Sequence, residues 1–171
     1  MFYELAKERY SVRHYSQQPV EDFKINIILE VGRISPTAAN KQPHKIYVLK
    51  SLEAMDKARE TTRMIYDAPI ALLICYDKTL SWKANAFGEE YDGGEVDAAI
   101  VTTSMMMQAT ELGVGTLWVR GFDSRKVSEV FELPENIHPV CYLLLGYPSD
   151  DSSPKSSHNS RKELYEIVTY L

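Results

Sequence analysis

The segment from Glu95 to Leu112 constrains the fold more than any other part of the chain. It has the length of a helix, contains no proline, and carries apolar residues on several faces in its middle. A helix that is apolar nearly all round is normally buried on all sides. We therefore expect this helix to lie at the centre of the domain or between two copies of the chain, and the segment alone does not choose between a core helix and a dimer helix.

The same segment is too short to cross a membrane. Charged and polar residues at both ends leave an uncharged run well short of the ~20 residues that a transmembrane helix needs. Gly113 then ends the helix, since glycine adopts the left-handed C-terminal cap most easily. The residues 114–119 that follow are typical of a strand.

Composition favours one domain and gives no sign of general binding to nucleic acid or membrane surfaces. The chain has 171 residues, with 24 acidic and 19 basic side chains and a formal net charge of −5. This balance implies no dominant basic face, so any anion site must be local. Cys75 and Cys141 lie in apolar strand-like runs without metal-binding spacing. We expect buried, reduced thiols and a cytoplasmic protein, with a disulfide as the alternative.

Helical and strand-like segments alternate along the chain. Helical spacing is found in residues 2–8, 21–33, 51–62, 95–112, 123–133 and 161–171. Strand-like runs occupy residues 44–50, 68–76, 114–119 and 139–146. Such alternation ordinarily indicates a doubly wound parallel sheet. Against this, no strand is followed by a Gly-rich phosphate turn, and the glycines at 113–116 lead from helix into strand, the wrong direction for a dinucleotide fingerprint.

Two segments have no regular period. Residues 77–94 contain Trp82, Phe87 and Tyr91 among charges and glycines, and we expect a lid, a pocket wall or a plain surface loop. Residues 147–159 are polar and serine-rich, yet helical spacing resumes after them. A chain that becomes ordered again after such a stretch is expected to cross to another binding surface.

Candidate chemistry is confined to a few short motifs. The sequence has no nucleophile elbow, zinc motif or phosphate-binding P-loop, and its four histidines are scattered. Arg9, Ser11 and Arg13 place two guanidinium groups and a hydroxyl within five residues. Such a group suits an anion clamp, because arginine forks match phosphate oxygens. Taken alone, the triplet is more often a solvated basic turn.

Taken together and in order, the motifs resemble those of the FMN-dependent nitroreductase family over nearly the whole chain. They are RYSVR at 9–13, SPTAANKQP at 35–43, the helix and turn at 97–116, LP at 133–134 with LGYP at 145–148, and HNSRKEL at 158–164. Gln108, Val114 and Glu163 depart from the family pattern, but none of them belongs to the expected phosphate ligands.

The resemblance implies an α+β subunit with three α/β/α layers around a mixed, mostly antiparallel sheet, in an intertwined homodimer. Residues 1–171 would form one FMN-binding domain, and residues 149–171 would form an arm that packs on the partner subunit. FMN would be held noncovalently at the subunit interface, and no metal is implied.

The resemblance also implies which residues bind the cofactor. Arg9, Ser11 and Arg161 would hold the FMN phosphate. Arg13 would lie near the pyrimidine edge of the ring, where positive charge stabilises the anionic reduced flavin. The implied set of cofactor-binding residues is Arg9, Tyr10, Ser11, Arg13, Pro36, Thr37, Ala38, Asn40, Gln42, Gly115, Thr116, Leu117, Trp118 and Arg161.

Two further segments would contact the flavin ring. The loop Pro36–Asn40, together with Gln42, would contact the ring system from the other subunit. The turn Gly113–Trp118 would bring its backbone against the isoalloxazine, since glycine lets backbone approach a flat ligand closely.

The activity that the resemblance implies is an FMN-dependent NAD(P)H oxidoreductase. NADH or NADPH would deliver hydride to FMN and leave, and a nitroaromatic, quinone or similar acceptor would follow over the same ring face. Because the flavin carries the chemistry, no catalytic acid or base is expected. Trp82, Phe87 or Tyr91 would be stacking walls for an aromatic acceptor. The alternatives are another flavin reaction on this scaffold, a non-catalytic flavin carrier or sensor, and a dimerisation module without flavin.

Overall fold

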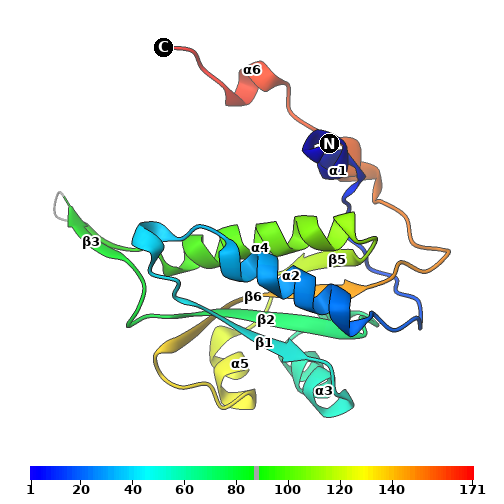
Figure 1. Cartoon of the computed structure of the whole chain (residues 1–171), viewed down its shortest axis with the longest axis horizontal. Coiled ribbons are helices and arrows are strands. Elements are labelled where there is room, and N and C mark those ends of the chain that lie inside the picture. The colour runs from blue at the N-terminus through cyan, green and yellow to red at the C-terminus, as the bar shows by residue number, and fades with distance from the viewer. Residues whose placement is uncertain (87–88) are drawn as a thin grey trace.

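The computed structural model describes residues 1–86 and 89–171, and its centre is a four-stranded sheet (Figure 1). The strand order is β1 (His44–Leu49), β2 (Ile70–Asp77), β6 (Ile137–Gly146) and β5 (Gly115–Val119). Every neighbouring pair of strands in this sheet is antiparallel. A separate antiparallel hairpin consists of β3 (Lys83–Ala86) and β4 (Glu89–Asp92).

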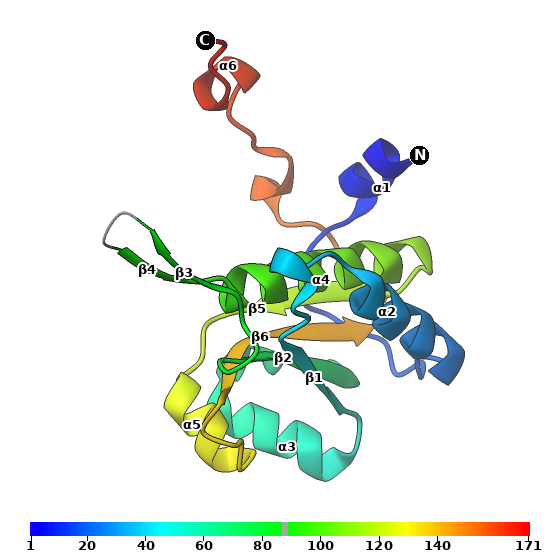
Figure 2. The same ribbon diagram turned by 60° about the vertical axis from the view of Figure 1, so that its left-hand side comes forward.

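Helices cover both faces of the sheet (Figures 1 and 2). On one face lie α2 (Asp22–Ile34) and α4 (Gly94–Glu111), and on the other α3 (Leu52–Thr61) and α5 (Ser124–Val130). The remaining helical pieces are α1 (Phe2–Glu8), α6 (Leu164–Ile167), η1 (Ala38–Asn40), η2 (Arg63–Ile65) and η3 (Ser156–Asn159). The predicted three-layer α+β class is confirmed. The parallel component seen among the described residues is an isolated bridge between Ser11 and Thr116.

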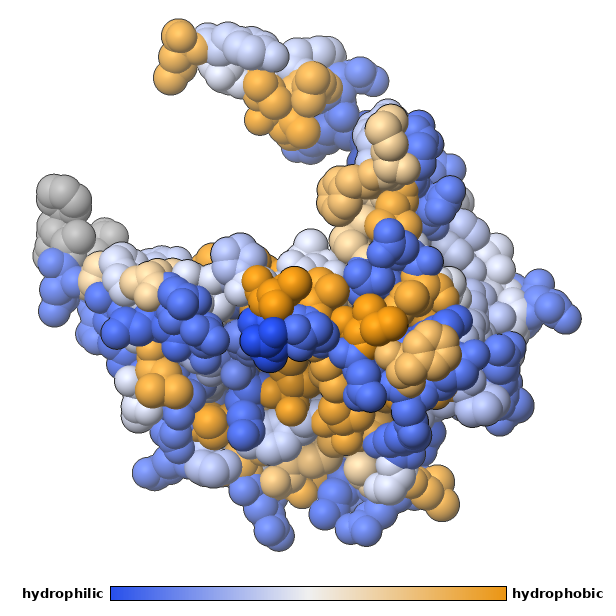
Figure 3. Space-filling model, viewed as in Figure 1, coloured by the Kyte–Doolittle hydropathy of each residue, from blue (hydrophilic) through white to orange (hydrophobic). Residues whose placement is uncertain are grey.

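The C-terminal segment is less helical than its sequence predicts. Helical spacing extends over 161–171, but α6 is a single turn of four residues, and residues 159–171 are all exposed. This segment stands away from the body and carries apolar surface, as does the outside of α2 (Figure 3). A short helix needs tertiary packing to persist. Within one protomer nothing among the described residues supplies that packing.

The helix α4 is buried on one side and open on the other. Val101, Met105 and Ala109 are fully buried against the sheet and α2, whereas Val96 and Ile100 are 50% and 38% exposed. Of the two expected positions, a core helix covered on all sides does not fit the single protomer, and a helix between two copies of the chain stays a prediction. Among the described residues, no helix is long and apolar enough to span a membrane.

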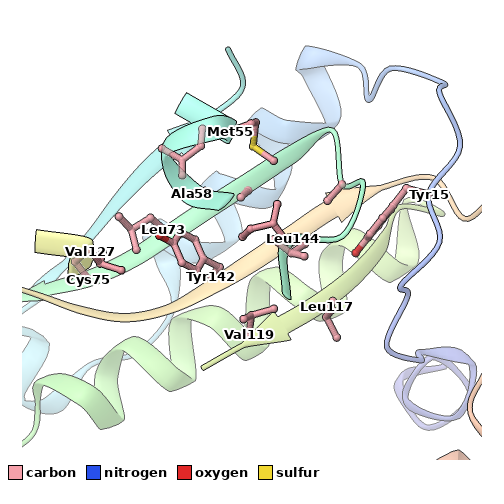
Figure 4. Close-up of a cluster of buried hydrophobic side chains, with 14 of the residues drawn as sticks. Tyr15, Met55, Ala58, Leu73, Cys75, Leu117, Val119, Val127, Tyr142 and Leu144 are labelled. Atoms are coloured by element: carbon pink, nitrogen blue, oxygen red, sulfur yellow. The ribbon is translucent and has the colours of Figure 1, made fainter. Parts of the chain in front are cut away.

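The two central strands are buried on both faces, so the sheet separates two apolar cores. In β2, Leu73 and Cys75 face α3 and α5, while Leu72 and Ile74 face α2 and α4. Successive strand side chains point to opposite faces, so a strand between two cores needs a continuous apolar run. Figure 4 shows the core on the α3 and α5 side, where Tyr142 of β6 is buried.

Local sequence signals set several element ends as predicted. The Ser51 hydroxyl accepts a hydrogen bond from the Ala54 N–H at 3.2 Å and caps α3. The Asp123 carboxylate accepts one from the Arg125 N–H at 2.9 Å and caps α5. Gly113 follows α4 with φ of 72°, the left-handed conformation expected of a glycine cap.

The two cysteines are free thiols, as expected, and they lie in the two different cores. Burial raises the pKa of Cys75 and of Cys141 to about 12. Because the thiolate is the reactive form, we expect neither to react with a thiol reagent at neutral pH until the protein is unfolded in urea. Rapid labelling of the folded protein would contradict this.

Each Cys→Ser substitution should lower the free energy of unfolding by about 1–3 kcal/mol.

Candidate functional site

The residues that follow α1 form an extended strap, residues 9–13, along β5. The Val12 N–H donates to the Thr116 carbonyl at 2.9 Å, and Ser11 forms the parallel bridge with Thr116. The Val12 side chain is buried in the core. Because side chains alternate along extended backbone, this burial turns Ser11 and Arg13 to the opposite side. The Arg13 guanidinium donates to the Ser11 carbonyl at 2.9 Å.

The C-terminal part of the chain returns to this strap. Directly after β6, Pro148 forms an antiparallel bridge with Tyr15. The Tyr10 hydroxyl and the Ser152 hydroxyl are hydrogen-bonded at 3.2 Å. The turn η3 then places the His158 ring edge-on to the Tyr10 ring, with centroids 6.4 Å apart. The first and last parts of the sequence therefore build one region of the surface.

Arg9 and Arg161 come from these two ends, and Arg161 lines a small hollow with Ala6 and Lys7 of α1, just before Arg9. Burial of the Arg9 guanidinium and, to a smaller extent, the positive charge of Arg161 lower the pKa of Arg9. The Arg161 guanidinium donates to the carbonyl of Ser160 at 2.8 Å. Within the described residues, neither arginine forms an ion pair with a carboxylate. Two like charges left without a counter-charge favour the binding of an anion.

Three small hollows, two along the strap and one between α1 and the C-terminal segment, are here called the basic hollows. Their volumes are about 180, 230 and 90 Å³. The first and third share Tyr10 as a wall, and the second and third share His158. The Lys and Arg side chains that line them are Lys7, Arg9, Arg13, Lys155 and Arg161. Glu8 also lines the first hollow.

The groups around the first hollow fit a phosphate-bearing flat cofactor. The Thr116 hydroxyl is buried and has no hydrogen-bond partner among the described residues. A Cβ atom added to Gly115 would lie 2.7 Å from the Val12 side chain and 3.0 Å from the Gly146 carbonyl, so glycine is needed for this close backbone contact. The Arg9 guanidinium, the unpaired Thr116 hydroxyl and the backbone at Gly115 are groups that can bind FMN.

The next two predicted residues of β5 point elsewhere. Leu117 is buried in the core on the α3 and α5 side. Trp118 is half-buried and packs against the core on the α4 side. Neither residue lines the basic hollows. A ligand there would meet the backbone of this strand and not these two side chains.

The predicted ring-contacting loop is a compact turn stabilised by its own hydrogen bonds. The Gln42 N–H donates to the Thr37 hydroxyl at 3.0 Å, and the Gln42 amide donates to the Asn40 side-chain oxygen at 3.1 Å. The Ala38 N–H donates to a carboxylate oxygen of Asp97, in the first turn of α4, at 2.8 Å. Pro36, Asn40 and Gln42 are exposed.

The structure does not bring this loop to the basic hollows of the same chain. The loop contacts α4 at Asp97, whereas the first hollow reaches the other end of α4 at Thr110. At about 1.5 Å per residue, these positions are roughly 20 Å apart along the helix axis. The three basic hollows contain no residue of the loop. The predicted site is thus divided into two parts within one protomer.

The irregular segment 77–94 is largely the hairpin of β3 and β4. Trp82 and Tyr91 lie edge to face at its base, with ring centroids 5.9 Å apart. A Cβ atom added to Gly93 would lie 3.8 Å from the Ala38 side chain, so the base of the hairpin adjoins the loop. Phe87, the third predicted wall residue, lies outside the described residues.

Two residues of the candidate site, Lys155 and Asp97, are not among the site residues predicted from the sequence. Lys155 lines the third basic hollow, but it lies in the serine-rich stretch, where no spacing pattern marks it. Asp97 belongs to a quoted motif, yet its bond to Ala38 joins residues far apart in sequence and leaves no local signal. Within the described residues, no group of three His, Cys, Asp or Glu side chains is placed to hold a metal ion.

Comparison with known proteins identifies the family. The nitroreductase family profile matches residues 6–64 and 59–147. A solved structure of a nitroreductase family protein from Clostridium difficile is 42% identical, with a TM-score of 0.92 over 99% of this chain and 98% of that one. An Archaeoglobus fulgidus protein named as a candidate NADH dehydrogenase/NAD(P)H nitroreductase is 30% identical over 84% of this chain and 83% of its own length.

A third relative carries a cofactor in its name. The Bacillus subtilis protein named FMN reductase (NAD(P)H) is 29% identical over 85% of this chain and 65% of its own length. The family profile spans most of the sequence, and the structural similarity extends over nearly all of it. The chain therefore belongs to the nitroreductase family.

Proposed function

We propose that the protein is an FMN-dependent NAD(P)H oxidoreductase that reduces nitroaromatic, quinone or similar acceptors by ping-pong hydride transfer. The observation that carries this proposal is that Arg9, which has no carboxylate partner within the described residues, lines the same hollow as the unpaired Thr116 hydroxyl and feels the charge of Arg161. This arrangement suits the FMN phosphate. The relative named FMN reductase supports the same cofactor and electron donor.

Each part of the basic hollows has a task in this proposal. Arg9, Ser11 and Arg161 bind the phosphate, and Lys155 adds positive charge beside them. Arg13 would lie at the pyrimidine edge of the ring. Bound FMN would supply the redox chemistry between NADH or NADPH and the acceptor. The protein supplies binding, orientation and a positive field that stabilises the anionic reduced ring.

The proposal includes a homodimer, because much apolar surface remains uncovered in one protomer. A groove of about 660 Å³ runs between α1 and the open face of α4. On the C-terminal segment, Leu164, Tyr165 and Ile167 are each at least 66% exposed. Exposed apolar patches of this kind mark interaction surfaces. We propose that residues 149–171 form an arm that packs on the second copy, with residues 1–171 as one domain.

A dimer also joins the two parts of the site. Residues 36–42 lie at the far end of α4 from the basic hollows of their own chain. We propose that they contact the flavin ring held by the partner protomer. Trp82 and Tyr91, beside this loop, then form a stacking wall for an aromatic acceptor.

The two free thiols fit a reducing compartment, and the proposal includes a cytoplasmic location.

A visible-absorbance titration tests the function. Purified full-length protein is expected to take up FMN, to lose its yellow colour anaerobically with NADH or NADPH, and to regain it with menadione or nitrofurazone. Titrating each nicotinamide separately gives the donor preference. A yellow protein that neither nicotinamide bleaches would instead be a carrier or sensor. Failure to bind FMN, in a protein shown to be folded by circular dichroism, would refute the proposal.

A further inference from the structure

Asp97 is a buried acidic residue that the proposed chemistry does not use. It lies in the first turn of α4 and is 2% exposed. One carboxylate oxygen accepts the Ala38 N–H at 2.8 Å. The other oxygen is buried without a hydrogen-bond partner among the described residues. A buried carboxyl oxygen without a hydrogen-bond partner lowers stability, so its presence calls for a structural or functional explanation.

The loop that Asp97 contacts has a strained backbone. Ala39, Asn40 and Gln42 have φ values of 49°, 53° and 50°, in the left-handed region that residues other than glycine rarely adopt. Such residues persist only where surrounding contacts determine their conformation. The hydrogen bond from the Ala38 N–H to Asp97 joins this loop to α4.

The end of the loop lies beside the same carboxyl group. His44 begins β1 directly after the loop, and its Nδ1 atom is buried without a partner among the described residues. Burial lowers the pKa of His44, and the nearby Asp97 carboxylate opposes that shift. Asp97 therefore faces both the middle of the loop and the residue that follows it.

We infer that Asp97 is the positioning residue for residues 36–42 and thereby for the wall of the flavin ring in the partner's site. This inference rests on the proposed function. Asp97 acts through the loop backbone and does not itself touch the cofactor. Its oxygen holds Ala38 in place, so that the strained residues after it present a fixed surface.

Hydrogen exchange of the cofactor-free protein tests the positioning directly. In Asp97→Ala, exchange of the peptide that covers residues 36–42 is expected to rise roughly tenfold to a hundredfold, because the half-buried Ala38 N–H loses its charged acceptor. Asp97→Asn keeps an oxygen for the Ala38 N–H and is expected to show exchange close to that of the original protein. Thr102→Ala, at a fully buried site on the same helix, is the control and should leave exchange of the loop unchanged.

Flavin spectra test the consequence for the cofactor. Asp97→Ala is expected to lower FMN affinity roughly tenfold or more and to alter the visible circular dichroism of the bound flavin, while Asp97→Asn restores both. Thr102→Ala should lower the free energy of unfolding without changing the FMN affinity or the visible circular dichroism of the bound flavin. A folded Asp97→Ala protein with unchanged loop exchange and unchanged flavin spectra would overturn the inference.

Two further measurements keep the test decisive. Should Asp97→Ala not fold, amide-resolved exchange of the original protein is used. The inference then requires a protected Ala38 amide next to a rapidly exchanging amide of the exposed residue Ala39, and equally rapid exchange of both would overturn it. Should the original protein bind no FMN while exchange of the loop behaves as described, the proposed function fails but the structural role of Asp97 stands.

Discussion

Replacing both Arg9 and Arg161 by alanine is expected to weaken FMN binding by at least about a hundredfold. A hydrogen bond to a charged group contributes about 1.5–3 kcal/mol, and about 1.4 kcal/mol corresponds to a factor of ten in affinity. Arg161→Ala alone should cost about 1–3 kcal/mol. Affinity is measured by titration of FMN fluorescence or visible absorbance at fixed salt concentration.

The double variant Arg9→Ala with Arg161→Ala should not lower the free energy of unfolding of the cofactor-free protein. Burial and the charge of Arg161 disfavour the charged form of Arg9, and no carboxylate compensates it within the described residues. Thermal unfolding with and without FMN separates the effects, because a ligand stabilises only the folded protein that binds it. Arg125→Ala, on α5, is the control. A double variant that binds FMN normally would remove both arginines from the phosphate site.

Mixing two inactive variants is expected to restore activity. One chain carries Arg9→Ala with Arg161→Ala, and the other carries Asn40→Ala with Gln42→Ala. If each flavin contacts the basic hollows of one protomer and the loop of the other, a heterodimer contains one intact site and one doubly damaged site. Heterodimers purified through two different tags should bind one FMN per dimer and have about half of the normal activity.

Activity returns in the heterodimer only if the loop and the basic hollows of one site come from different protomers. If the loop and the basic hollows served the same chain's site, each site in the heterodimer would keep one defect and no activity would return. The homodimer of each variant gives the background activity. A heterodimer as inactive as both parents, though dimeric by light scattering, would contradict a site shared between protomers.

Local signals in the sequence were sufficient for most element boundaries. Ser51, Asp123 and Gly113 act as caps through bonds or backbone angles that involve only their close neighbours. The continuous apolar runs of β2 and β6 follow from the alternation of side chains between two cores. These features are predictable because their physical causes extend over only a few residues.

Where the predictions were wrong, the reason lay in missing neighbours. The apolar spacing of residues 161–171 indicated a helix, but only one turn forms because the described protomer offers it no surface. The apolar residues of α4 favour burial on all sides, and one face is open in the single protomer, so a position between two copies of the chain stays a prediction. Periodicity reports which residues favour burial, and it does not reveal what covers them.

The sequence by itself determined most of the secondary structure, the segments of the four-stranded sheet and, through its ordered motifs, the resemblance to one family. The tertiary structure alone decided that Arg161 lies against α1 just before Arg9, that Lys155 lines a hollow with Arg13, and that residues 36–42 lie at the other end of α4. The physical reason is the separation in sequence of the interacting residues. Helix caps and the alternation of strand side chains depend on residues a few positions apart. A cluster of charged side chains from distant parts of the chain depends on distances that only the folded backbone sets.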